Sequence, residues 1–499
     1  MEAEAAPVGQ WAAFRADLRK GWAKLNNRTS VSHKRVVVLV IAVGAALRIS
    51  QLGLGVIYDE AFTYTDYASK PIGFILSNYA SPNNHILHTL LVKLSCTVFG
   101  VHLWSLRLPA LLAGIAAMPL FYVFVRAMFN RYIALIALSF VAASGALIEY
   151  SALARGYSLT WAFMLCAMIA GRHFAKSNNM VSALLVAAFN ALGMWAVTTM
   201  VYAALGCYLW LFMYIWYSYD SSLRRRAVRL GISFGCFLLF TALLYAPVIM
   251  MHSVDQLFHH PTVGENTWET FVATHQDKAF ELWAYFTDTA ATWISIAGMA
   301  GLAYAAYVSS KYRVLLIALV LGAVPLSVAQ TLIGPPRVWT YILFNLHLSS
   351  GIAIFYLLKL VQERVYEGFS KRLRTVVASF VVLAGMGWLG ITGMKDRLER
   401  HADAHQAASW FIGVLKTGDR VYVATPTDAP FEFYLIEEGL DRDLLRHERS
   451  PNGRMYVLVG PSDGQTLQSV LEANNQRLPE HPPLVKVKDW KRLEIFATP

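Results

Sequence analysis

Charged residues and cysteines are scarce in this chain of 499 residues. Only 15% of the residues are charged and 56% are hydrophobic, which excludes a water-soluble globular protein of this length. The four cysteines, at positions 96, 166, 207 and 236, lie in apolar segments and none forms a CxxC pair. We therefore expect neither disulfides nor a cysteine metal site, and the composition indicates a polytopic membrane protein.

Nucleotide-binding motifs are missing as well. The chain contains neither GxxxxGK[ST] nor GxGxxG, so neither nucleotide hydrolysis nor a bound dinucleotide is indicated. Lys and Arg outnumber Asp and Glu by 43 to 32, but the segment after residue 394 holds 14 basic and 16 acidic residues. The basic surplus therefore belongs to the membrane part, as the positive-inside rule requires, and we expect no nucleic-acid partner.

Residues 1–34 lack the short apolar core and small-residue cleavage site of a signal peptide. Their basic residues predict a cytoplasmic leader, part of which forms an amphipathic helix lying on the membrane. Apolar windows of roughly 18 to 25 residues, the length that crosses a bilayer, then recur over residues 35–394. With the basic clusters placed inside, the pattern predicts an all-α membrane domain of about eleven transmembrane helices.

Two segments of the first outer loop are apolar but short. IGFILSNYA and HILHTLLVKLSCTVFG are broken by polar residues and predict interfacial helices rather than spans. An odd number of spans places residues 395–499 on the outer side. This tail alternates β-type runs (VYVAT, MYVLVG, RLEIFAT) with helical patterns, which predicts a small extracytoplasmic α/β domain.

Charged residues near the outer ends of spans are the candidates for chemistry, because burying them in lipid is costly. Arg48, near the end of the first span, is expected to be a snorkelling anchor rather than a ligand group. The adjacent acids Asp59 and Glu60 follow that span on the outer side. Composition alone leaves two alternatives open for them. In the first they are a helix cap or ordinary loop charges, and in the second a general base or a metal ligand.

Three further polar stretches end on the same side. SPNNHILH is expected to be a capping segment in which Asn84 or Asn83 satisfies free backbone amides. IEYSALARGYSL places Glu149, Arg155 and Tyr157 where an outgoing span turns back. An arginine at such a turn is either an interfacial anchor or a phosphate ligand, since its planar fork binds two oxygens.

PPRVWTY repeats this pattern late in the chain with Arg337 and two aromatic residues, the second of which is Tyr341. The outer loop from residue 251 to residue 281 is rich in histidine and acids. Its His252, His259 and His260 lack the spacing of a metal motif. They are therefore only a weak sign of a metal site, and a mobile loop is the favoured interpretation.

Taken in order, four stretches resemble one family. DEAFTY, NNHILHTLLVKLSCTVFG, WSLRLPALLAGIAAMPLFYVFVRAMFNR and YSALARGYSL resemble the GT-C glycosyltransferases that use polyprenyl-phosphate sugars. These include bacterial relatives of protein O-mannosyltransferases and of the aminoarabinose transferases that modify lipid A. The resemblance covers residues 35–160 well, PPRVWTY moderately and the tail weakly.

The resemblance implies a membrane glycosyltransferase of the bacterial inner membrane, with a cytoplasmic N-terminus and a periplasmic C-terminal domain. A polyprenyl-phosphate sugar donor enters from the bilayer lipids. The acceptor, an envelope glycan, lipid or protein hydroxyl, enters from the aqueous side. The sugar, the acceptor and the carrier length are not indicated by the sequence.

The resemblance also assigns roles residue by residue. Asp59 matches the acid that activates the acceptor or organises the site, and Glu60 lies beside it. A Mg²⁺ or Mn²⁺ ion, whose presence stays open, would be held by these two acids. The resemblance assigns donor-phosphate binding to His85, Arg155, Tyr157 and Arg337, and possible substrate contacts to Asn83, Asn84, Glu149 and Tyr341.

One departure from the family pattern stands out. Many relatives carry an acid two residues before the first arginine, whereas this chain has Leu153 there, and Glu149 is the possible replacement. The expected mechanism makes Asp59 the base and lets Arg155 and Arg337 hold the phosphate, while the loop of residues 251–281 closes as a lid. The alternatives are a transporter or flippase of a lipid-linked sugar and a non-catalytic scaffold, both of which would tolerate loss of Asp59.

Overall fold

The computed structural model describes most of the chain and forms two compact units. The first, here called the membrane unit, comprises Met1–Gln51, His85–His88 and Ala110–Lys395. The second, the loop–tail unit, comprises Leu52–Asn84, Thr89–Pro109 and Asp396–Pro499. The described residues are 9–27, 29–218, 222–252, 267–287, 292–364, 370–393, 400–440, 445, 453–476 and 484–499.

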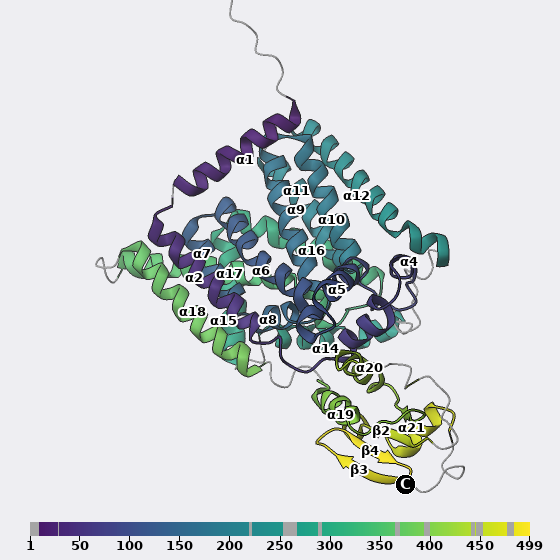
Figure 1. Ribbon diagram of the computed structural model, residues 1–499. Coiled ribbons are helices and arrows are strands. Elements are labelled where there is room, and N and C mark those ends of the chain that lie inside the picture. Colours follow the sequence, from purple (N-terminus) through teal and green to yellow (C-terminus); the bar gives the residue numbers. More distant parts are fainter. Residues whose placement is uncertain are drawn as a thin grey trace, which may run out of the picture. The chain divides into compact units, whose positions relative to one another are not determined.

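The membrane unit is helical (Figure 1). Most of α6 (Leu103–Met128) belongs to it. Its other helices are α1 (Gln10–Asn27), α2 (Val31–Ile49), α7 (Arg131–Ala143), α8 (Gly145–Ser151), α9 (Tyr157–Ser177), α10 (Met180–Ala196), α11 (Met200–Ser218), α12 (Leu223–His252), α14 (Trp268–Phe286), α15 (Thr292–Val308), α16 (Ser310–Ala329), the 3₁₀ turn η3 (Pro336–Trp339), α17 (Ile342–Arg364) and α18 (Lys371–Gly393).

Fewer helices than expected qualify as membrane spans. Among the described residues, six are long and apolar enough to cross a membrane, namely α6, α11, α12, α16, α17 and α18. The pair α7 and α8, bent by 61°, would make a seventh if it is one broken span. The expected number of about eleven is therefore not confirmed. Helices such as α5 (Ile86–Phe99) and α10 are apolar but shorter than the roughly 20 residues that a span requires.

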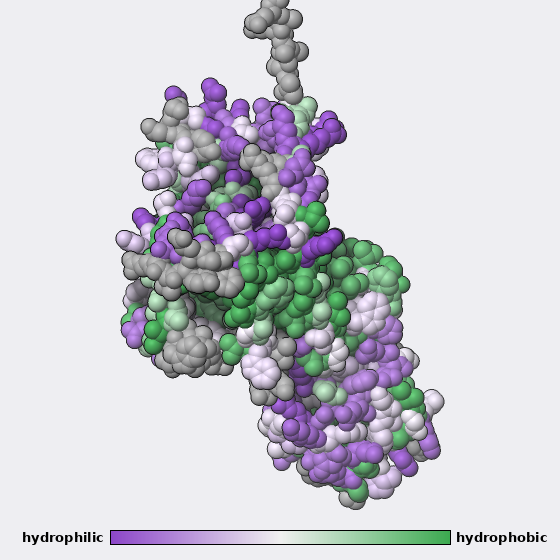
Figure 2. Space-filling model, turned by 90° about the vertical axis from the view of Figure 1, so that its left-hand side faces the viewer, coloured by the Kyte–Doolittle hydropathy of each residue, from purple (hydrophilic) through white to green (hydrophobic). Residues whose placement is uncertain are grey.

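Small residues allow close helix contacts within this unit. A Cβ on Gly322 of α16 would lie 2.5 Å from the backbone N of Gly206 on α11, and one on Gly351 of α17 would lie 2.9 Å from the N of Ala137 on α7. Such contacts bring backbones together where lipid offers no hydrophobic driving force. Large apolar side chains such as Leu239 on α12 stay exposed, and Figure 2 shows apolar surface in green on one face.

The predicted amphipathic leader corresponds to α1. Phe14 is buried against the ring of His173, and Asp17 lies 3.3 Å from the Nε2 atom of the same histidine. Trp11, whose ring stacks on that of Phe14, and Trp22 stay exposed. This exposed aromatic face suits the interfacial position expected from the sequence.

The loop–tail unit begins with four short helices: α3 (Tyr58–Phe62), the π-helix η1 (Thr63–Ala68), α4 (Ile72–Ser77) and α5 (Ile86–Phe99). The first turn of α5 is assigned to the membrane unit and the rest of that helix to this one. The tail adds α19 (Ala402–Ile412), α20 (Asp428–Glu437), η5 (Pro461–Asp463) and α21 (Leu467–Ala473). Its strands are β1 (Arg420–Tyr422), β2 (Met455–Val459), β3 (Val485–Asp489) and β4 (Glu494–Ala497).

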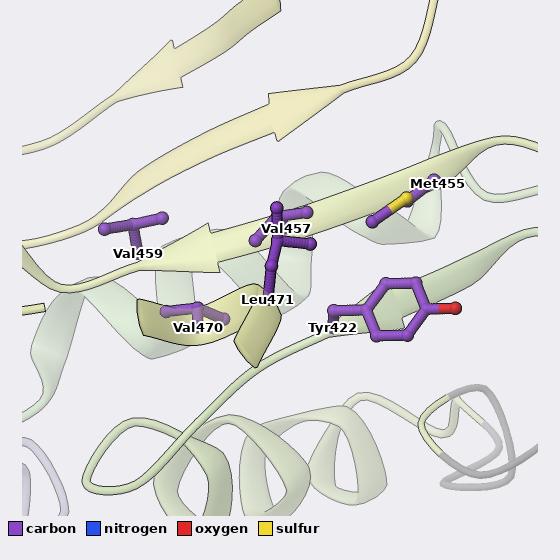
Figure 3. Close-up of a cluster of buried hydrophobic side chains, with 6 residues drawn as sticks. All are labelled: Tyr422, Met455, Val457, Val459, Val470 and Leu471. Carbon is purple, nitrogen blue, oxygen red and sulfur yellow. The ribbon is translucent and has the colours of Figure 1, made fainter. Parts of the chain in front are cut away.

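The four strands form a mixed sheet in the order β1-β2-β4-β3. β1 pairs with β2 in parallel and the other pairs are antiparallel. The central strand β2 is buried along its whole length, which explains its continuous apolar run MYVLV. Edge strand β3 is exposed throughout, so its VKVKD sequence carries no core pattern. The sheet core consists of Tyr422, Met455, Val457, Val459, Val470 and Leu471 (Figure 3).

The first outer loop and the tail pack together within this unit. The hydroxyl of Tyr434 on α20 accepts the backbone N–H of Val56 (2.9 Å), and the carbonyl of Val56 accepts the N–H of His401 (2.9 Å). The ring of Phe433 meets the ring of Tyr64 edge to face at 5.8 Å. The sequence predicted this loop as part of the membrane domain, whereas the structure groups it with the tail.

Candidate functional site

Asp59 lies in the first turn of α3, in the loop–tail unit. Its half-buried side chain benefits from the positive end of the helix, where an acid is favourable. Its carbonyl oxygen accepts hydrogen bonds from Asn83 Nδ2 (3.0 Å) and Thr63 Oγ1 (2.8 Å). The backbone that carries this carboxylate is therefore fixed from a second segment of the loop.

Glu60 has a different environment from its neighbour. Both Glu60 and Arg107 are fully buried, and the guanidinium binds both carboxylate oxygens, with Nε–Oε1 at 2.8 Å and Nη2–Oε2 at 2.6 Å. Arg107 also donates to the carbonyls of Leu52, Leu54 and Gly55. A carboxylate held this way stabilises the loop.

Sequence reasoning missed Arg107. The available signal was an arginine near the start of an otherwise apolar segment, LWSLRLPALLAG, because an ionisable group at such a place needs a partner. Its partner lies 47 positions earlier in the chain. No local pattern identifies a pair at that separation.

Replacing Arg107 with lysine is expected to lower the stability of the folded protein. Lysine keeps the charge but loses the planar fork, so at least one carboxylate oxygen and some loop carbonyls lose their donor, at a cost of about 1–3 kcal/mol. The apparent melting temperature of the purified full-length protein measures this. The matched control is Arg225→Lys on the exposed surface of α12, and equal melting temperatures for both variants would contradict the role given to Arg107.

Asn83 and Asn84 are both buried in the same unit. Asn84 Nδ2 donates to the carbonyls of Ile75 (2.9 Å) and Asn78 (2.8 Å), and Asn83 donates to Asp59 as described. The side-chain oxygen of Asn84 accepts no hydrogen bond from the described residues. Of the two expected caps, Asn84 therefore does not serve as one. Its side-chain amide instead donates to two backbone carbonyls of the loop.

The second group of candidates lies in the membrane unit, at the turn between α8 and α9. Arg155 is only 4% exposed, and its Nη2 lies 3.4 Å from His85 Nε2. His85 Nδ1 accepts the backbone N–H of Gly156 (3.0 Å), which assigns the proton of a neutral ring to Nε2. Two N–H donors thus converge, and one anionic oxygen could accept from both.

Tyr157 completes this group. Its ring meets the His85 ring edge to face at 5.4 Å, and the Arg155 guanidinium lies 6.0 Å from its ring centre. Burial, then the charge of Arg155, holds the pKa of His85 well below its usual range, and His88 and Arg337 act in the same direction. His85 is therefore neutral at ordinary pH and cannot contribute a full positive charge.

His88, one helical turn after His85, was not singled out from the sequence. It is fully buried, and burial followed by the charge of Arg155 lowers its pKa to about 3. Neither ring nitrogen has a hydrogen-bond partner among the described residues. Its spacing of three from His85 on a helical pattern was the signal that could have identified it.

The other candidates of the membrane unit lie on α8, on η3 and just after η3. Glu149 is 2% exposed and its Oε2 accepts the hydroxyl of Tyr285 on α14 (3.2 Å). Arg337 is exposed on η3, and its charge adds to the lowering of the pKa of His85. Tyr341 is buried and lines a small, largely apolar pocket. Its hydroxyl has no hydrogen-bond partner among the described residues.

The metal hypothesis gains no support from the donor atoms. No three His, Cys, Asp or Glu side chains gather into a metal site within the described parts of the chain. Asp59 and Glu60 alone fit a divalent cation poorly, because Arg107 already occupies both Glu60 oxygens. His259 and His260 lie outside the described residues, and so do all of residues 253–266 of the expected lid. The last part of that lid forms the first turns of α14.

Arg48 is not a snorkelling anchor. It is only 1% exposed, and its guanidinium donates to three backbone carbonyls and one serine hydroxyl inside the membrane unit. The anchor prediction was wrong because α2 is covered by α7 and α8 at this level. A guanidinium there finds protein acceptors and does not need to reach water.

Comparisons with known proteins agree with the helical architecture. A family model described as dolichyl-phosphate-mannose-protein mannosyltransferase matches residues 83–245. That stretch includes His85, Arg155 and Tyr157. No curated protein sequence matches the chain significantly.

Solved structures are similar over most of the chain. ArnT from Cupriavidus metallidurans in the apo state has a TM-score of 0.59 at 14% identity, covering 92% of this chain and 97% of that chain. The same protein bound to undecaprenyl phosphate has a TM-score of 0.58 with equal identity and coverage. An oligosaccharyltransferase from Archaeoglobus fulgidus has a TM-score of 0.51 at 15% identity, covering 80% of this chain and 61% of that chain. The similarity to ArnT extends over nearly the whole of both chains.

Proposed function

We propose that this chain, which has the fold of the GT-C glycosyltransferases, moves a sugar from a polyprenyl-phosphate carrier to an acceptor hydroxyl. The family resemblance in the sequence is confirmed at the level of the fold. The observation that carries the proposal is the buried pair of N–H donors on Arg155 and His85. Such a pair suits a phosphate oxygen at the edge of a bilayer, where an anion without donors would be costly.

The phosphate is the leaving group of the proposed reaction. The bond between the sugar's anomeric carbon and the phosphate oxygen breaks, and negative charge accumulates on that oxygen. Arg155 supplies fixed positive charge and the neutral His85 supplies an N–H, so both favour the developing charge over the intact donor. Arg337, exposed on η3, adds a second positive charge.

The acceptor hydroxyl must lose its proton as its oxygen bonds to the anomeric carbon. Asp59 is the proposed base, because its carboxylate sits on a fixed backbone and Glu60 is held by Arg107. The proton passes from the acceptor oxygen to Asp59, and the carrier leaves as polyprenyl phosphate. The proposed site of action is the periplasmic side of a bacterial inner membrane, with an envelope glycan, lipid or protein as the acceptor.

Mass spectrometry of the cell envelope tests this function directly. We expect glycolipids or glycoproteins of cells lacking the gene to have lost one sugar, and the wild-type gene to restore it. The mass difference would identify the sugar and the acceptor together. Envelopes that are identical with and without the gene, under conditions where the protein is made, would refute the proposal.

A further inference from the structure

A buried arginine in α2 binds the break in the α7–α8 pair. Arg48 Nη1 donates to the carbonyl of Ala142 (3.0 Å) and Nη2 to that of Val141 (3.1 Å), both in the last turn of α7. It also donates to Gly44 in its own helix (2.9 Å). The helices are close enough that a Cβ on Gly44 would lie 2.9 Å from the Cβ of Ala142.

The break creates the need for these bonds. The helix ends at Ala143 and restarts at Gly145 with a bend of 61°. The last carbonyls of a helix have no amide partner in the next turn, and leaving them unsatisfied inside a membrane protein is costly. The cationic guanidinium satisfies two of them and also matches the negative end of the helix dipole.

Arg48 also holds the far side of the break. Its Nε donates to the hydroxyl of Ser151 (3.2 Å), the last residue of α8, and that hydroxyl donates to the carbonyl of Leu147 (2.6 Å). Gly114 on α6 leaves room for this serine, since a Cβ there would lie 2.1 Å from its Oγ. One guanidinium therefore connects α2, the end of α7 and the end of α8.

The connection leads directly to the phosphate-binding turn. Ser151 precedes Arg155 by four residues, and the intervening Ala152, Leu153 and Ala154 are all buried. The turn then closes on His85 through the N–H of Gly156. Because packed side chains leave this segment little freedom, a shift of Ser151 moves the Arg155 backbone with it.

We propose that Arg48 is a positioning residue that sets the bend between α7 and α8 and thereby the place of Arg155 opposite the donor phosphate. This inference rests on the proposed function, because it assigns a target to the positioned arginine. Arg48 itself touches no substrate. Its effect is expected on affinity for the lipid phosphate rather than on the amount of folded protein alone.

Equilibrium binding of radiolabelled undecaprenyl phosphate to the full-length protein in nanodiscs tests the inference. We expect Arg48→Gln to raise the Kd per folded molecule about tenfold, and Arg48→Lys to raise it about threefold because a point charge retains some of the contacts. Ser151→Ala removes only the link to α8 and is expected to raise the Kd about threefold. The apparent melting temperature without ligand is recorded for each variant.

The matched control is Ser139→Ala. Ser139 is a fully buried serine of α7 whose hydroxyl also bonds the carbonyl four residues earlier, Leu135, but it does not contact Arg48. Its Kd should stay within about twofold of the wild type. Wild-type Kd values in Ser151→Ala and in folded Arg48→Gln, whatever their melting temperatures, would overturn the inference. If Arg48→Gln does not fold, Ser151→Ala decides. If the wild type and Ser139→Ala both fail to bind undecaprenyl phosphate, the proposed function is refuted, and this inference with it.

Discussion

Replacing Asp59 with asparagine is expected to reduce sugar transfer by about 10² to 10⁴-fold, the usual contribution of a general base. Asparagine has the same shape, and the bonds from Asn83 and Thr63 reach the backbone carbonyl of residue 59, so the loop keeps its geometry. The measurement is transfer in membranes supplied with the lipid-linked donor, normalised to folded protein. The melting temperature should stay close to that of the wild type.

The control for this prediction is Asp66→Asn. Asp66 is another acid of the same loop, on η1, where its Oδ2 accepts the hydroxyl of Thr65 (2.9 Å). It should retain most of the activity, which separates the base from a general need for negative charge in the loop. Full transfer by Asp59→Asn would sink the base assignment, and a transporter or a scaffold would show that tolerance.

The Asp59–Glu60 pair shows where sequence reasoning stopped. Their position after the first apolar run was visible, and the family resemblance distinguished them from ordinary loop charges. The resemblance made Asp59 the expected base and placed Glu60 only beside it, without a physical reason for the difference. The structure separates them, because Arg107 binds the buried carboxylate of Glu60 from 47 positions away, whereas the side chain of Asp59 in the same helix turn is half-buried.

The helical class was predictable because composition and apolar windows report it directly. The number of spans was not, since windows along a sequence count short or bent helices such as α10 and the α7–α8 pair as full crossings. The prediction for Arg48 was wrong for a related reason. Its distance from the end of the helix suggested a side chain reaching for water, whereas its real acceptors become available only where α7 breaks.

Tail strands were predictable in proportion to their burial. β2 and β4 lie within the apolar runs marked in the sequence and β1 overlaps one of them, because each contributes side chains to the sheet or its core. β3 was missed although its valine–lysine alternation is a strand pattern, and all five of its residues are exposed. The packing of α20 on the first outer loop is a tertiary contact, through Tyr434 and Phe433, and no pattern in either segment reports it.

Replacing Arg155 with lysine is expected to lower transfer by about 10² to 10³-fold, as for the loss of one donor to a developing oxyanion. Lysine keeps the charge but cannot reproduce the fork beside His85 Nε2. The control is Arg313→Lys on α16, an exposed arginine that also donates to backbone carbonyls, those of Ala306 and Tyr307. It should change transfer less than about twofold.

A double variant tests whether Arg155 and His85 serve the same oxygen. His85→Gln alone should also reduce transfer, since glutamine offers a donor from a different position. If both residues donate to one phosphate oxygen, Arg155→Lys combined with His85→Gln should cost clearly less than the sum of the two single effects in free energy. Strict additivity, or an Arg155→Lys enzyme with wild-type transfer, would contradict a shared phosphate site. Non-additivity in transfer with an unchanged melting temperature would tie both donors to the leaving group.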